Sequence, residues 1–112
     1  MLIKCARLHQ INTPLVIEEV ELLSPLHDQV TVKIHFAGVN FYESMLLRGR
    51  YPTKSGFPYV VGGEFSGEVV SIGDHVKDFR AGDRVFSFAQ TGHGTTGSYA
   101  IYANVDTKYL YH

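Results

Sequence analysis

The chain contains a single cysteine, Cys5, and no tryptophan among its 112 residues. One cysteine cannot form an internal disulfide or a multi-cysteine metal site, and such usage is typical of a reducing compartment. No apolar run approaches the ~20 residues that would span a bilayer, and Lys4 and Arg7 stand too early for a signal-peptide core. We therefore expect a cytoplasmic protein that is neither exported nor associated with a membrane.

An excess of charge of one sign is also missing. Ten Lys and Arg balance eleven Asp and Glu, and the net charge is -1. No stretch gathers the basic residues into a stripe that could neutralise a phosphate backbone, which argues against nucleic acid as a partner. Apolar residues make up 45% of the chain and charged residues 19%. This balance is typical of a globular protein, and the length predicts one domain that covers residues 1–112.

Alternation of apolar and polar residues is the main pattern that is present. Val30, Val32, Ile34 and Phe36 alternate with polar residues, which predicts a strand with one apolar face. Similar segments are separated by turn-forming residues, and the predicted strands cover residues 2–8, 15–22, 30–36, 65–72, 84–88 and 99–105. Many short strands of this kind favour a barrel or a sandwich.

One segment departs from this alternation. Asn40 is a suitable N-cap, residues 41–48 include good helix formers, and Gly49 provides a stop, so the sequence predicts a short helix there. Between Pro52 and Pro58 the composition favours a loop.

Residues 92–97 match the spacing G-x-G-x-x-G, which in a dinucleotide site opens a helix under a pyrophosphate. Residues 98–104, however, are β-branched and aromatic, and no βαβ unit follows them. We interpret the motif as a loop between strands. The basic residues Arg48, Arg50 and Lys54 could meet a phosphate or an acidic substrate, but a solvated loop face is the favoured interpretation.

Histidine is the only abundant metal-ligating residue besides the carboxylates. The six histidines lack the spacing of a metal site, and we interpret them as residues of the surface or of strand faces. They are His9, His27, His35, His75, His93 and His112.

Four blocks carry a resemblance to a known family. They are GVNFYESMLLRGRYP at residues 38–52, GGEFSGEV at 62–69, FRAGDRV at 79–85 and GSYAIY at 97–102. In this order the four blocks resemble the N-terminal domain of the medium-chain dehydrogenase/reductase superfamily, and specifically of its quinone oxidoreductase branch. The resemblance implies a mainly β, GroES-like, partly open barrel with one or two short helices.

The resemblance also implies a chemistry. Zinc alcohol dehydrogenases of this superfamily have a zinc-binding Cys at the position of Asn40 and a zinc-binding His at that of Gly63, so this chain resembles the zinc-free branch. Such enzymes transfer hydride from NADPH to a quinone or an α,β-unsaturated carbonyl. Asn40 and Tyr51 match residues that contact the cofactor and substrate, and both are expected to be catalytic and cofactor-binding, without a metal.

Other positions are expected to line the substrate pocket. These are Tyr42, Met45, Glu64 and Gln90. Relatives usually have a small residue at the position of Tyr42 and commonly an aspartate at that of Glu43, and some quinone reductases have a tyrosine at that of Met45. The resemblance therefore does not identify the substrate. Taken singly, Asn40 could also be only a helix cap, Tyr51 a packing aromatic and Glu64 a structural carboxylate.

The relatives continue into a Rossmann domain that is absent from this chain. Since that domain makes most of the dinucleotide contacts, we expect residues 1–112 alone to bind NADPH weakly and to be inactive. Apolar surface without its covering segments would favour a homo-oligomer. The alternative function is a GroES-like interaction module without catalysis, because a fold alone does not determine a function.

Overall fold

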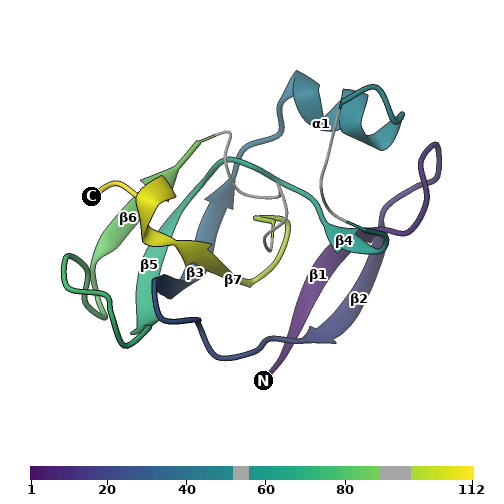
Figure 1. Ribbon diagram of the computed structural model, residues 1–112. Coiled ribbons are helices and arrows are strands. Elements are labelled where there is room, and N and C mark those ends of the chain that lie inside the picture. The colour runs from purple at the N-terminus through teal and green to yellow at the C-terminus, as the bar shows by residue number, and fades with distance from the viewer. Residues whose placement is uncertain (52–55, 89–96) are drawn as a thin grey trace.

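The computed structural model describes residues 1–51, 56–88 and 97–112. They form two antiparallel sheets with one α-helix at one end of the molecule (Figure 1). Gln90, most of the glycine motif, and the region from Pro52 to Ser55 lie outside the described residues.

The three-stranded sheet has the strand order β2-β1-β4. Strand β1 (Leu2–Leu8) pairs along its length with β2 (Val16–Glu21), and its last residues pair with β4 (Tyr59–Val60). Alternate residues of β1 point inward, which buries Ile3 and Cys5. The sequence did not predict β4, because two residues after a proline carry no alternation that could be recognised.

The four-stranded sheet has the order β6-β5-β3-β7. Its strands are β3 (Gln29–Ala37), β5 (Phe65–Ile72), β6 (Arg84–Ser87) and β7 (Tyr102–Asp106), and the 3-10 helix η1 (Thr107–Tyr109) follows β7. One face of this sheet holds the larger hydrophobic core, in which Val30, Val32 and Val69 are completely buried.

The expected apolar face of β3 is interrupted at Phe36. The pairing of β3 with β5 shifts between Ile34 and Phe36, so Ile34 lies opposite Gly67 whereas Phe36 lies opposite Ser66. A bulge of this kind moves the following side chain to the other face of the sheet. The phenylalanine is therefore 77% exposed, and the prediction that it shares the apolar face of Val30, Val32 and Ile34 is wrong.

Residues 99–101 join the two sheets. The Ala6 N–H donates to the Tyr99 carbonyl at 2.7 Å, and the Ile34 N–H donates to the Ile101 carbonyl at 2.9 Å. This segment replaces the beginning of the predicted last strand, which starts only at Tyr102. Within the described ranges the sheets meet without closing into a complete barrel, which confirms the predicted mainly β, partly open GroES-like fold.

Helix α1 (Phe41–Leu47) confirms the predicted helix after Asn40. It ends before Gly49, whose φ of 72° is accessible to glycine at little cost. On its inner side Leu46 packs in a second hydrophobic cluster with Leu8 and Val61. No helix in the described part of the chain is long and apolar enough to cross a membrane.

Candidate functional site

The turn before α1 carries Asn40, the first of the predicted site residues. Asn40 is extended, with φ -116° and ψ 164°, and its backbone N–H donates to Oε2 of Glu43 at 3.2 Å. The Glu43 N–H in turn donates to the Asn40 carbonyl at 3.2 Å. This pattern occurs where a Glu at the third helical position reaches back to the N-cap. It fixes the backbone from which the Asn40 side chain projects.

The Asn40 side chain contacts Glu64, the second predicted site residue. Its Nδ2 donates to Glu64 Oε2 at 3.3 Å. The Glu64 carbonyl accepts the Gly38 N–H at 2.8 Å and the Ser98 hydroxyl at 3.3 Å. Gly38 leaves room for this side chain, because a Cβ there would lie 2.6 Å from Glu64 Oε1. The sequence thus brings residues 24 positions apart into one polar contact.

Glu43 is a buried carboxylate beside this contact. Its side chain is 3% exposed, and no described residue forms a hydrogen bond with its Oε1. Burial raises the pKa of the Glu43 carboxyl and the charge of Glu64 adds to this, while nearby hydrogen-bond donors act in the opposite direction. From sequence, Glu43 was noted only as a departure from the family pattern. The spacing of Asn40 and Glu43 could have indicated the cap contact.

A group of tyrosines packs on the other side of Glu43. The rings of Tyr42 and Tyr51 lie 5.2 Å apart between centroids and are tilted by 56°. Tyr99, which sequence reasoning did not select, donates from its hydroxyl to the Gly38 carbonyl at 3.4 Å. Burial and then the charge of Glu43 raise the pKa of Tyr99 to about 12, and the same two causes raise the pKa of Tyr42. These two phenols are therefore protonated at neutral pH and can donate hydrogen bonds.

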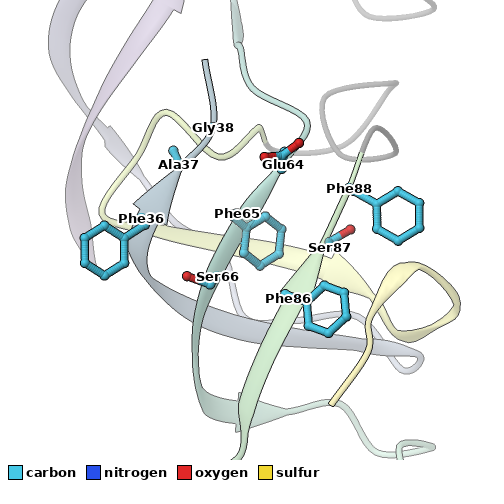
Figure 2. A pocket seen from close by; sticks show the side chains of 9 residues that line it. All are labelled: Phe36, Ala37, Gly38, Glu64, Phe65, Ser66, Phe86, Ser87 and Phe88. Carbon is cyan, nitrogen blue, oxygen red and sulfur yellow. The ribbon is translucent and has the colours of Figure 1, made fainter. Parts of the chain in front are cut away.

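A pocket of about 350 Å³ opens beside Glu64, on the outer face of the four-stranded sheet (Figure 2). Phe36 of β3 stands on one side, the small Ser66 of β5 in the middle, and Phe86 and Phe88 on the other side. Because Phe36 was predicted to lie on the same apolar face as Val30 and Val32, the sequence did not indicate this aromatic pocket. The complete lining is Phe36, Ala37, Gly38, Glu64, Phe65, Ser66, Phe86, Ser87 and Phe88.

The model of the alcohol dehydrogenase GroES-like domain matches residues 27–112. The chain belongs to this family. It is 34% identical over 105 residues to the quinone oxidoreductase of Rattus norvegicus, with 91% of this chain and 31% of that protein covered. The chain therefore spans about a third of the length of this relative.

Solved structures agree with this assignment. An alcohol dehydrogenase superfamily protein from Novosphingobium aromaticivorans has a TM-score of 0.87 and 30% identity, over 96% of this chain and 33% of that one. The Escherichia coli quinone oxidoreductase, solved in complex with NADPH, has a TM-score of 0.85 and 25% identity, over 96% of this chain and 32% of that one. These likenesses confirm the predicted quinone-oxidoreductase type of GroES-like domain.

Within this GroES-like domain the predicted site residues fall into two groups. Glu64 lines the pocket and holds Asn40, whereas Tyr51 packs with Tyr42 in the second hydrophobic cluster. The Met45 carbonyl accepts the N–H of Arg50 at 2.8 Å, which closes the end of α1. The roles of these residues in binding and catalysis stay predictions. Among the described residues, no three His, Cys, Asp or Glu side chains gather closely enough to hold a metal ion.

Proposed function

We propose that residues 1–112 form the catalytic domain of a zinc-free, NADPH-dependent reductase of quinones or α,β-unsaturated carbonyls, and that a separate domain binds most of the dinucleotide. The observation that carries this proposal is the Asn40 side-chain amide, which donates at 3.3 Å to Glu64, a residue that lines an aromatic pocket. The family, with quinone oxidoreductases among its members, supports it. Asn40 and Gly63 stand where the zinc enzymes have a Cys and a His ligand, so these two zinc ligands are replaced in this sequence.

The residues around Asn40 suit the nicotinamide end of the cofactor better than its phosphate groups. Glu64 is an exposed acceptor, which favours a carboxamide or another N–H donor and repels phosphate groups. The described residues here thus fit the nicotinamide end, with Asn40, Tyr51 and Glu64 as the groups that would contact it. When bound, NADPH supplies a hydride to the conjugated substrate.

The Asn40 amide stabilises the charge that this transfer creates. One N–H of Nδ2 is directed to Glu64, and the second is available for a substrate oxygen. As a quinone accepts hydride, an oxygen becomes negative, and a donor that is already oriented stabilises it with little reorganisation. A phenol such as that of Tyr51 donates a proton to this oxygen and regains one from water. In the overall reaction, quinone, NADPH and one proton are converted to hydroquinone and NADP⁺.

Steady-state kinetics test this proposal. The complete reading frame that contains these residues is assayed for NADPH oxidation with a small quinone and with an enone. We expect Asn40→Ala to lower kcat by roughly 10²-fold, as for loss of an oxyanion donor, and Tyr51→Phe to lower it by a factor on the order of 10². Leu23→Ala, at an exposed apolar residue, is the control. Turnover like that of the wild type in both site variants would contradict the assignment.

Residues 1–112 alone are expected to show no measurable turnover, because the described residues offer carboxylates rather than a cradle for phosphate. Isothermal titration of this polypeptide with NADPH checks the point. Micromolar binding would show that the separate dinucleotide domain is unnecessary.

Exposed aromatic surface favours a second candidate, an interaction module that self-associates. Phe36, Phe86, Phe88 and Tyr111 are 77%, 43%, 52% and 47% exposed, and the Tyr111 ring stacks on both Phe86 and Phe88. Contiguous apolar surface of this kind often marks an interface. Its presence does not conflict with catalysis, since an oligomer of reductase domains would satisfy both.

A further inference from the structure

Glu43 lies at a position in the fold where burial of a carboxylate has a high cost in free energy. It lies in the first turn of α1, 3% exposed, next to a hydrophobic cluster that contains Leu46 and Tyr42. A buried carboxylate loses its hydration and regains only part of it through hydrogen bonds. Here Oε2 accepts the Asn40 N–H, and Oε1 has no hydrogen-bond partner among the described residues. An apolar residue of similar size would pack at this position without that cost.

What the carboxylate does can be read from the hydrogen bond that its Oε2 accepts. Its Oε2 accepts from the backbone of Asn40, while the side chain of the same Asn40 donates to Glu64. Asn40 is therefore held from two directions, from α1 through its backbone and from the residue that precedes β5 through its side chain. Loss of the backbone contact frees the rotation of the peptide before the helix, and the amide group moves with it.

We propose that Glu43 is a positioning residue that holds the Asn40 backbone so that the Asn40 amide keeps its place between Glu64 and the substrate oxygen. This inference rests on the proposed function, in which Asn40 binds that oxygen. Glu43 itself contacts neither substrate nor cofactor in this scheme. It contacts the Asn40 backbone and is not among the residues that line the pocket.

The groups that surround Glu43 explain why glutamine is the informative substitution. Glu64 faces it with a like charge, and Tyr42 and Tyr99 are close enough for the Glu43 charge to raise their pKa values. No positively charged residue is among the causes of its own pKa shift. A glutamine keeps an acceptor oxygen at the same reach and removes the charge. If position is what matters, Glu43→Gln preserves the Asn40 contact and Glu43→Ala does not.

Nuclear magnetic resonance on the 112-residue chain tests the contact without any need for activity. In Glu43→Ala we expect the Asn40 backbone N–H to exchange with solvent about tenfold faster relative to that of Val32, since one hydrogen bond is lost. The side-chain amide resonances of Asn40 should also shift toward those seen in Glu64→Ala. In Glu43→Gln both signals should stay close to the wild type.

Leu46→Ala is the matched control, because Leu46 is equally buried on the same helix but faces the hydrophobic cluster. It should lower the melting temperature and leave the Asn40 signals in place. If Glu43→Ala leaves both Asn40 signals unchanged, or if Leu46→Ala alters them to the same extent, Glu43 is merely a structural residue and the proposal is overturned.

Kinetics of the complete enzyme then separate this inference from the proposed function. We expect Glu43→Ala to lower kcat by at least about tenfold with little change in the KM for the quinone, and Glu43→Gln to restore most of it. An inactive wild type would overturn the proposed reductase while the resonance data still decide the contact. An active wild type with unchanged kcat in Glu43→Ala would defeat the positioning role alone.

Discussion

At the scale of single residues, the site is defined by two carboxylates with opposite surroundings. Glu64 is exposed and accepts the Asn40 side chain, whereas Glu43 is buried and accepts the Asn40 backbone. Sequence alone predicted Asn40 and Glu64 through the family pattern. It could not predict the difference in burial between the two carboxylates, because that difference arises from Leu46 and the tyrosines that close over α1.

The raised pKa of Glu43 predicts a pH dependence of stability. A carboxyl whose pKa is higher in the folded state contributes stability below its unfolded pKa, and this is lost as the pH rises through the folded value. A glutamine does not titrate, so the Glu43→Gln variant does not lose this stability as the pH rises. The melting temperature of the variant minus that of the wild type should therefore be larger at pH 7 than at pH 4. Thermal unfolding followed by circular dichroism measures the difference.

The lowered pKa values of Glu18 and Asp83 act in the opposite direction in both proteins, so they cancel in that comparison. A difference in melting temperature between variant and wild type that does not change with pH would show that Glu43 titrates normally in the folded protein.

At the scale of the elements, most strands could be predicted and their irregularities could not. Strand β5 has the predicted bounds, because Phe65, Gly67 and Val69 alternate inward without interruption. Strand β3 contains two shifts in register, and alternation in a single sequence does not reveal which residue is the extra one. The aromatic pocket depends on the second shift, which explains why it was found only in the structure.

Gly38 in the site and Gly67 in the sheet differ in how easily their surroundings can make room for a side chain. A Cβ on Gly38 would meet the flexible end of Glu64 at 2.6 Å, whereas a Cβ on Gly67 would meet the rigid Lys33 carbonyl at 2.2 Å. We expect Gly38→Ala to displace Glu64 and release the Asn40 amide, at a cost in unfolding free energy below about 1 kcal/mol. Gly67→Ala should cost about 2 kcal/mol or more, because β3 and β5 must separate.

Denaturant unfolding of the two variants compares these costs, and the Asn40 side-chain resonances report the release. Equal destabilisation by both changes would mean that Glu64 is as rigidly held as the strand.

At the scale of the whole molecule, the described residues form two hydrophobic cores, and Tyr99 of the segment that joins the sheets packs against the smaller one. The larger core belongs to the four-stranded sheet, and the smaller one supports α1. The outer face of the four-stranded sheet is left with exposed aromatic rings at β3 and β6. Composition could not indicate this, because phenylalanine is most often a core residue and the register shift that turns Phe36 outward is not visible in the sequence.

This surface predicts self-association that depends on concentration. We expect light scattering with size exclusion to show a fraction above the monomer mass that falls in Phe36→Ser, because a 77% exposed ring is replaced by a small polar group. Leu23→Ser, at a residue that is 75% exposed away from the pocket lining, should leave the distribution unchanged. A monomer at every concentration would exclude this face as an interface between copies.

The segment that joins the sheets has a mechanical consequence for the site. Its backbone is bonded to β1 at Ala6 and to β3 at Ile34, and its Tyr99 hydroxyl reaches the Gly38 carbonyl. The loop that bears Asn40 is therefore connected through this segment to both sheets. A movement of one sheet relative to the other would therefore shift the Asn40 amide, so a partner that binds across the joining segment would restrict the position of this amide without contacting it.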